Sequence, residues 1–490
     1  MSLREADHQE PDHRESAPRA STLRIGGLLI PVVWGVIAGL WTPRGPVTAA
    51  QALASIGVSL VVGLGAGRLT RSRWSMLLAP VAFAAAVELV RVGYAGPTVD
   101  FPHLDPLGIL ALLVGRGVHG LLALLPLLVG AAYGAGLARR GEPVRGRRLR
   151  RYLGRGTVGV LAAATALVAV GVAVPAGTAA IPGGIAELTM VGKLGLMIRG
   201  VHPDAPVLLF MAGPPGGSEL GAMRLHLSGL EQHFVVATAD RRGGGKSYGG
   251  LDPTGTLTLD DETASILTLT DYLRKRFGKD KIYLLAQSGS TLPGVFAVQR
   301  HPELFHAYVS AAQAVDLTAS DRSQYADTLA WARAKGDTAL ADQLTALGPP
   351  PYRDIHSYAP MLLNEGGAFA YPGAIDTGSG QAENFEVPEH SLLDKVHVFS
   401  GFLDTFGVLY PRERDIDLRT MVTRLDVPSY FVDGAHDVPG RLALMQPWFD
   451  ALQAPYKERV IFPDAGHRSM FEKPAEFVAL MDRVLTETRG

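Results

Sequence analysis

The first 178 residues contain five apolar stretches, each close to the length of a membrane-spanning helix. Such a helix needs about 20 mostly apolar residues, because the hydrocarbon core is about 30 Å thick and each residue rises about 1.5 Å. The five stretches cover residues 25–41, 49–67, 74–94, 117–138 and 157–174. Residues 24–178 are therefore predicted to form an all-α transmembrane domain of about five helices, with residues 1–23 as a tail before it.

A sixth apolar run, residues 104–115, is too short to span, and we expect it to lie at the interface or to re-enter the membrane. Arginines predict the orientation, because short cytoplasmic loops collect basic residues. They precede the first stretch, lie between the second and the third, and number eight from Arg139 to Arg155. With five spans these groups share one side, so the tail is predicted to be cytoplasmic and the C-terminal domain extracytoplasmic.

An alternative interpretation takes the first stretch as a signal peptide that is cleaved near Ala50. Glu88 and Arg91 also allow two interpretations. Charges inside a span mark a functional site by default, but near the end of a span they pair and reach the headgroups. The apolar stretches contain no transporter-like series of acids or histidines. The domain is therefore predicted to anchor the chain, with membrane lipid as its partner.

Composition removes several functions from consideration. The sequence contains no cysteine, which excludes disulfides, thiolate metal sites and a cysteine nucleophile. The formal net charge is -1, and no basic stripe alternates with aromatic residues. No nucleic-acid partner is therefore predicted.

From about residue 185 onward the polarity is mixed, and short β-rich runs alternate with helical ones. The expected strands are residues 207–211, 234–239, 281–286, 307–311, 429–433 and 459–462, and the expected helices are 260–277, 292–299, 442–452 and 474–488. This alternation predicts an α/β fold with a doubly wound, mostly parallel sheet. Its core would comprise residues 185–314 and 424–490, interrupted by a mainly helical lid at residues 315–423. Aromatic lid residues such as Trp331 are candidates either for the substrate pocket or for the lid core.

Ser288 lies where one predicted strand ends and a predicted helix follows. In a nucleophile elbow, small residues two before and two after the serine let strand and helix approach, while a tight turn exposes the hydroxyl. Ala286 and Ser290 hold those places here, small but not glycine. A serine in such a turn can also be purely structural.

Two later strand ends supply the groups that a serine nucleophile needs. A base must take the hydroxyl proton, and a carboxylate must orient that base. Asp437 follows the strand at 429–433, and His467 follows the strand at 459–462. The chain order Ser, Asp, His at successive strand ends is that of an α/β-hydrolase triad. His436 is a rival base, but it is adjacent to Asp437 and would have to point another way to reach Ser288.

Three stretches resemble the proline iminopeptidase branch of the α/β-hydrolases, across nearly all of residues 190–490. Residues 209–217, LFMAGPPGG, resemble that family's His-Gly-Gly-Pro-Gly loop, and residues 240–247, DRRGGGKS, resemble its Asp-Gln-Arg-Gly-x-Gly-x-Ser run. The third stretch is the elbow through residues 301–305, HPELF. A phosphate loop at residues 245–247 is excluded, because Asp240 stands where that motif needs a glycine.

The sequence also departs from the family pattern. The resemblance implies that the second glycine of the first loop donates a backbone N–H to the oxyanion, but Pro214 occupies its place and has none. The amide of Gly289 remains available. The amide of Gly213 or Gly216, or a side chain such as Gln287 or a lid residue, is a candidate for the missing donor. Gln287 is also a candidate for substrate binding.

The resemblance implies that lid glutamates bind a free amino group of the substrate. Glu365 is the candidate here, and a solvated loop acid is the alternative interpretation of it.

The sequence as a whole predicts a membrane-anchored serine hydrolase that cleaves an amide or an ester in a small molecule or short peptide. Neither a metal nor an organic cofactor is expected. Two alternatives stay open: the same triad performing a non-hydrolytic step, or a catalytically silent, membrane-tethered binding protein.

Overall fold

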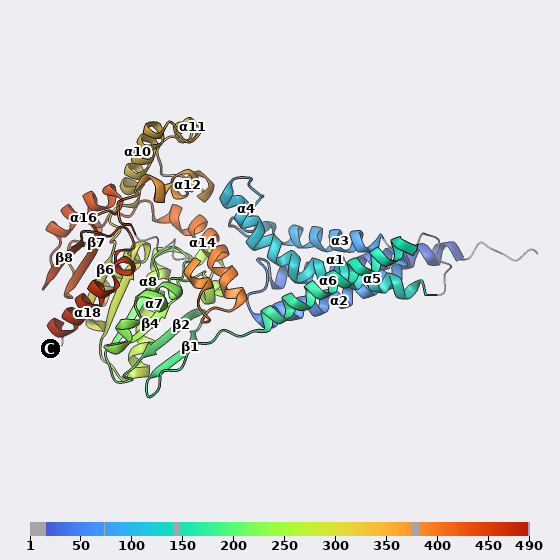
Figure 1. The fold of residues 1–490 in the computed structure, drawn as a ribbon, viewed down its shortest axis with the longest axis horizontal. Helices are drawn as coiled ribbons and strands as arrows, with labels where there is room; N and C mark the ends of the chain where they lie inside the picture. Colours follow the sequence, from blue (N-terminus) through green and yellow to red (C-terminus); the bar gives the residue numbers. More distant parts are fainter. Residues whose placement is uncertain (1–15, 73, 141–147, 375–381, 489–490) are drawn as a thin grey trace, which may run out of the picture. The chain divides into compact units, whose positions relative to one another are not determined.

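The computed structural model describes residues 16–72, 74–140, 148–374 and 382–488 and divides into two compact units (Figure 1). Unit 1 comprises Met1–Gly93 and Gly117–Ala173, and unit 2 comprises Tyr94–Arg116 and Val174–Gly490. The first fifteen residues of the predicted cytoplasmic tail and residues 141–147 of the arginine-rich loop lie outside the described residues.

Unit 1 is all-α. Its helices are α1 (Ser16–Trp41), α2 (Ala49–Thr70), α3 (Ser75–Val90), α5 (Val118–Ala138) and α6 (Arg148–Ala173). Helices α2 and α5 approach so closely that a Cβ on Gly63 would meet the Leu127 carbonyl at 2.1 Å, and one on Gly130 would meet the Leu60 carbonyl at 2.2 Å. Such small-residue contacts are typical of helix pairs in membranes.

Among the described residues, four helices are long and apolar enough to cross a membrane. They are Ala49–Thr70, Ser75–Gly93, Pro106–Ala138 and Gly154–Ala173, and α1 adds a shorter apolar helix, Gly26–Trp41. At the end of α3, Arg91 Nε donates to Glu88 Oε2 at 3.0 Å, so these two charges pair with each other.

The apolar run at residues 104–115, predicted to lie at the interface or to re-enter the membrane, is helical. It forms α4 (Pro106–Leu112) and a π-helical turn (Leu113–Gly117) that continue without a break into α5. Residues 94–116 also belong to unit 2 and not to the helical unit that the sequence suggested. The length of the apolar run alone could not reveal a helix shared by two compact units.

Unit 2 is built on an eight-stranded sheet of order β1-β2-β4-β3-β5-β6-β7-β8. The strands are β1 (Ile185–Val191), β2 (Leu194–Gly200), β3 (Val207–Met211), β4 (Val235–Ala239), β5 (Ile282–Gln287), β6 (Phe305–Ala311), β7 (Ser429–Gly434) and β8 (Lys457–Phe462). β1 and β2 pair antiparallel, β2 also pairs antiparallel with β4, and the other pairs are parallel. The predicted fold class is confirmed.

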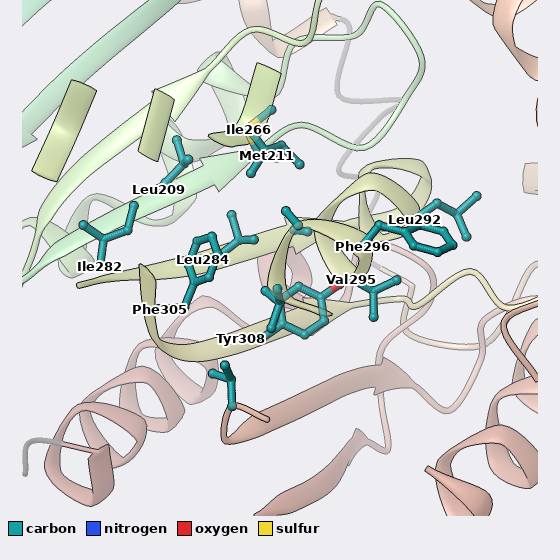
Figure 2. Close-up of a cluster of buried hydrophobic side chains, with 14 of the residues drawn as sticks. Leu209, Met211, Ile266, Ile282, Leu284, Leu292, Val295, Phe296, Phe305 and Tyr308 are labelled. Carbon is teal, nitrogen blue, oxygen red and sulfur yellow. The ribbon is translucent and has the colours of Figure 1, made fainter. Parts of the chain in front are cut away.

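Helices cover both faces of the sheet. One buried cluster joins the sheet to α8 (Leu259–Phe277), α9 (Thr291–Arg300) and α16 (Pro439–Ala451), and the other joins it to α7 (Leu220–His226) and α18 (Pro474–Thr488). Figure 2 shows Ile282 and Leu284 of β5 in the first cluster, with Val295 of α9 and Tyr308 of β6. The central strands are buried on both faces, which explains why their sequences are continuous apolar runs.

The six predicted strands are present with bounds shifted by at most two residues, but the β1–β2 hairpin was missed. Its connection is Gly192-Lys193, with Gly192 at φ +60°. β1 lies at the sheet edge and is only partly buried, so it lacks the strong apolar run that identifies the inner strands.

The insertion between β6 and β7 is mainly helical, as predicted for a lid. It contains α10 (Leu317–Lys335), α11 (Thr338–Leu347), α12 (Ile355–Leu362), α13 (Glu365–Ala368), α14 (Leu392–Glu413) and α15 (Leu418–Met421). Figure 1 shows α10, α11 and α12 together on the side of unit 2 away from the β1–β2 hairpin.

Candidate active site

Ser288 lies in a tight turn between β5 and α9. Its φ is +50°, a left-handed conformation that residues other than glycine rarely adopt. Ser290, two residues later, donates its hydroxyl to the Met211 carbonyl at 2.8 Å and so ties the turn to the end of β3. Across the turn, a Cβ on Gly294 would meet the Ala286 Cβ at 3.0 Å. A residue larger than alanine at position 286 would therefore force the strand and helix apart.

Ser288, His467 and Asp437 form a continuous chain of contacts. His467 Nε2 lies 2.8 Å from Ser288 Oγ, and His467 Nδ1 lies 2.9 Å from Asp437 Oδ2. With Nδ1–H donating to the carboxylate, the lone pair of Nε2 faces the serine hydroxyl. Burial opposes ionisation of Asp437, but the charges of His467 and Arg441 outweigh it and hold the pKa of that carboxyl well below its usual range. The three groups therefore have the geometry and the charge that a serine nucleophile and its base require.

The rival residues have other partners. His436 stacks on Tyr371, with ring centroids 4.2 Å apart and planes 3° from parallel. Lys246, the basic residue of the glycine-rich stretch, pairs with Asp394 at 3.0 Å.

The loop after β3 approaches Ser288 through Gly213. A Cβ on Gly213 would come within 3.0 Å of the Ser288 Cβ and within 2.0 Å of Gln287 Oε1, so only glycine fits. The loop then turns: Gly217 N donates to the Pro214 carbonyl at 2.8 Å, and Gly216 has φ +61°. Proline before a glycine of positive φ is typical of a type II turn.

A cavity of about 210 Å³ opens beside Ser288 and lies under the lid. Ser288, Gly289, His467, Gly213 and Pro214 line its floor. Its walls come mainly from α10, α12 and α14, and they combine apolar and aromatic side chains with a few charged ones; the charged wall residues are Asp316, Asp321, Glu365, Glu413 and Arg441.

The site and sheet can now be compared with known proteins. No protein-family model matches the chain. A curated relative, the probable aminopeptidase YbaC of Bacillus subtilis (strain 168), is 24% identical over 310 residues, which are 59% of this chain and 92% of that protein. Proline iminopeptidase of Mycobacterium smegmatis, a crystal structure, is 18% identical with a TM-score of 0.46 and covers 62% of this chain and 98% of its own. Carboxylesterase CesB of Bacillus subtilis is 15% identical with a TM-score of 0.42, covering 62% of this chain and 91% of its own.

The fold is identified by the sheet and by the positions of three residues at its strand ends. A mostly parallel sheet carries a serine in a strained turn after β5, followed along the chain by an aspartate after β7 and a histidine after β8. Unit 2 has the α/β-hydrolase fold. The similarity of this hydrolase unit to proline iminopeptidases, predicted from three motifs, is confirmed at the level of the fold.

Arg441 of the hydrolase unit contacts both His467 and Asp437. It was not predicted from the sequence. Its Nη1 lies 3.1 Å from Asp437 Oδ1, 3.1 Å from His467 Nδ1 and 3.5 Å from Glu365 Oε1. Arg441 follows Asp437 by four residues, but Asp437 lies before α16 begins, so the spacing alone does not predict the contact between them.

Two cavity acids of the hydrolase unit have perturbed ionisation. Burial raises the pKa of Asp321 to about 6, although hydrogen bonds from Tyr410 and Tyr358 favour the ionised form. Burial likewise raises the pKa of Glu413 to about 7, partly offset by the charge of Arg241. Such shifts are enriched at functional sites, and both acids face the cavity next to Ser288.

Arg241 stands where the resemblance expects the family's glutamine, and it is fully buried. Its Nε pairs with Glu262 Oε2 at 2.6 Å, and its Nη1 donates to the Gly213 carbonyl at 2.9 Å. The guanidinium therefore fixes the loop that carries Gly213 and Pro214. Nothing in the resemblance predicted this role.

The three predicted substrate-binding residues lie in different places. Glu365 lines the cavity, where Gln324 Nε2 donates to it at 3.1 Å. Gln287 is buried beneath the turn and is not among the cavity-lining residues described. Trp331 is also absent from that lining; it packs against Gly367, with Lys335 Nζ 4.4 Å above its ring.

One group in the described part of the chain brings metal-ligand atoms within 4.8 Å of one another, namely His103, Asp105 and His356. The two imidazoles stack with centroids 3.9 Å apart and planes 14° from parallel. A metal ion lies in the plane of each imidazole that binds it, and two stacked, nearly parallel planes do not meet at one ion. We therefore assign the cluster as a contact of His356 Nδ1 with Asp105 Oδ2 at 2.8 Å, which is an ion pair when the imidazole is protonated.

Proposed function

We propose that the protein is a membrane-anchored serine hydrolase that transfers an acyl group from an amide or ester to water. The observation that carries this proposal is the contact chain from Ser288 Oγ through His467 to Asp437, at 2.8 and 2.9 Å.

In the proposed reaction His467 Nε2 accepts the Ser288 hydroxyl proton while Oγ forms a bond to the substrate carbonyl carbon. The tetrahedral intermediate collapses, the C–N or C–O bond breaks, and His467 returns the proton to the departing amine or alcohol. Water then attacks the acyl-enzyme, with His467 again as base, and releases the acid. Asp437 keeps the imidazole oriented and stabilises its cationic form throughout.

The amides of Gly289 and Gly213 are the proposed oxyanion donors. Gly289 follows the nucleophile directly, and Gly213 lies against it, since a Cβ on Gly213 would come within 3.0 Å of the Ser288 Cβ. Pro214 has no N–H to give, so the position that donates in the resembled family is replaced by its neighbour.

The cavity favours a small substrate that carries a positive charge. Asp321, Glu365 and Glu413 face it, and Arg441 is already engaged by Asp437 and Glu365. A free amino group near the scissile bond would meet these carboxylates, which agrees with the aminopeptidase name of the curated relative. We therefore propose an aminoacyl amide or short peptide as substrate, with Glu365 as an amine-binding residue and an aminoacyl ester as the alternative substrate.

The four helices of spanning length support membrane anchoring. Arginine-rich segments around Arg68–Arg71 and Arg139–Arg155 support a cytoplasmic side for those loops, and hence an extracytoplasmic hydrolase unit.

The test is labelling of the detergent-solubilised full chain with a fluorophosphonate, which reacts with an activated serine. We expect labelling at Ser288 in wild type and none in Ser288→Ala. Absence of labelling in wild type would favour the silent binding protein, an idea motivated by Pro214. Analysis of products from aminoacyl amides would then separate hydrolysis from a non-hydrolytic use of the same groups.

A further inference from the structure

The segment Tyr94–Arg116 connects two helices of spanning length, yet it folds as part of the hydrolase unit. Helix Ser75–Gly93 ends one residue before it, and helix Pro106–Ala138 begins inside it. A passive connection would be expected to expose its polar groups to water. This segment instead buries the polar side chain of Thr98 against the lid.

A buried polar contact ties the segment to lid helix α14. Thr98 N donates to Asp404 Oδ1 at 2.9 Å, and Thr98 Oγ1 donates to Asp404 Oδ2 at 2.6 Å. Thr98 is 1% exposed and Asp404 is fully buried. A buried carboxylate is costly unless it is hydrogen-bonded, and this segment donates one hydrogen bond to each oxygen of Asp404.

Apolar contacts extend the same interface to lid helix α12. Leu107 and Ala111 of α4 belong to one buried cluster with Tyr358 of α12 and Phe406 of α14. At its edge, the Asp105–His356 ion pair links the start of α4 to α12. The segment therefore packs on both α12 and α14 and contacts them through apolar side chains, hydrogen bonds and the Asp105–His356 pair.

The same two helices form a wall of the cavity on their inner side. Tyr358, Met361 and Leu362 of α12 and Phe402, Phe406 and Tyr410 of α14 line it. Tyr358 and Phe406 belong to both the interface cluster and the cavity lining. These two side chains therefore connect the interface cluster with the substrate space.

We propose that Tyr94–Arg116 is the outer layer of the lid and a positioning segment for the substrate cavity. This inference rests on the proposed function in taking the cavity beside Ser288 as the substrate site. This loop between two helices of membrane-spanning length thus determines which acyl groups fit the cavity. A fragment that begins at residue 185 would lack the segment, so it would not retain the full hydrolase activity.

The experiment uses full-chain variants and two fluorophosphonates, one with a small and one with a bulky substituent. Thr98→Val removes the hydroxyl donor to Asp404 and keeps the side-chain shape, whereas Thr98→Ser keeps the hydroxyl. Since a hydrogen bond to a buried charged group is worth about a factor of 10, we expect Thr98→Val to change the ratio of bulky to small labelling rates about 10-fold. Thr98→Ser should restore most of that change.

A second variant separates docking of the segment from the stability of α14. A Cβ on Gly407 would meet Pro97 Cδ at 3.0 Å, so Gly407→Ala pushes against the segment, although alanine favours the helix itself. It should shift the labelling ratio in the same direction as Thr98→Val. Thr70→Val is the matched control, because the Thr70 hydroxyl is buried but donates only within α2, to the Ala66 carbonyl at 2.8 Å.

Hydrogen exchange of α12 and α14 gives a readout that needs no nucleophile. Faster exchange there in Thr98→Val and Gly407→Ala, but not in Thr70→Val, is expected. Wild-type exchange and an unchanged labelling ratio in both variants would overturn the proposal. Failure of Ser288 to label in wild type would instead count against the proposed function, and exchange would still test the positioning role.

Discussion

Ser288 combines an unusual backbone conformation with an engaged side chain. A serine at φ +50° costs on the order of 1–3 kcal/mol unless its surroundings impose it, and here β5, α9 and the Ser290–Met211 hydrogen bond do so. Strain of this kind clusters at functional sites. Together with the His467 contact, it distinguishes Ser288 from a serine that merely ends a strand.

Ser288→Ala and His467→Ala should each reduce kcat by at least about 10³-fold, because each removes a partner in the same proton transfer. Residues that act as a unit are not additive, so the double variant should be hardly slower than either single one. Steady-state turnover of an aminoacyl amide checks this, with His436→Ala as the control. Retention of most activity by Ser288→Ala would show that another group is the nucleophile.

Pro214 allows a second prediction at this scale. If Gly213 donates in its place, the loop is built around proline's fixed φ, and Pro214→Gly should leave kcat unchanged or lower it by loosening the turn. If the site is impaired for lack of a donor, the new N–H should raise kcat at least about tenfold. Turnover of a generic ester measures the difference, and Pro215→Ala, in the same turn, controls for loop flexibility. A large gain in Pro214→Gly would contradict the Gly213 assignment.

At the scale of elements, the lid meets the core through buried charges. Glu413 at the end of α14 lies 3.9 Å from Arg241, which in turn pairs with Glu262 and holds the Gly213 loop. Burial raises the pKa of Glu413 from 4.5 to about 7. The last turn of α14 is therefore linked to the oxyanion loop through a group that titrates near neutral pH.

The folded hydrolase unit holds the Glu413 proton more tightly than the unfolded chain does. As pH rises from 4.5, the unfolded state loses that proton first, so stability falls until about pH 7 and stays lowered above it. The loss amounts to about 3 kcal/mol for 2.5 pKa units. Glu413→Gln should flatten this part of the pH dependence, measured by hydrogen exchange of α14 between pH 4.5 and 8.

The exposed residue Asp415 supplies the control, and Asp415→Asn should retain the wild-type pH dependence. An unchanged slope in Glu413→Gln would show that other groups, such as Asp321, account for it.

The elements themselves were predictable where burial leaves a continuous apolar run, as in β3 and β5. The edge strand β1 was missed because it is only half buried and carries a weaker pattern. The order Ser288, Asp437, His467 was also readable, because parallel strands bring their carboxyl ends to one edge. Arg441, Asp321 and Arg241 were not found, since their importance comes from contacts and burial that no local pattern encodes.

For the whole molecule, the sequence distinguishes an apolar part suited to a membrane from a part of mixed polarity. It does not reveal which connecting residues fold with which part. Residues 94–116 have the composition of a membrane connection, and their fold with the lid depends on pairs such as Thr98 and Asp404, 306 positions apart. Local periodicity contains no information about such a pair. The predicted division at residue 178 therefore separates elements that the structure keeps together.

The membrane topology of the chain is also predicted. Arg68 lies in the last turn of α2 and Arg71 caps that helix, and eight arginines occur from Arg139 to Arg155, so both connections are expected in the cytoplasm. The chain end after α6 then lies on the other side, and a reporter fused after Gly490 should be active only if it is an extracytoplasmic one. Protease added to intact cells should also reach the hydrolase unit.

Fusion of the same reporters after Arg140 is the internal control, because that site should give the opposite result. The described apolar part of α1, Gly26–Trp41, is shorter than the four helices of spanning length. Whether α1 spans fixes the side of the N-terminus, while the hydrolase unit's side follows from the arginine-rich loop before α6. Activity of a cytoplasmic reporter after Gly490 would therefore reverse the proposed location of the hydrolase unit, whatever α1 does.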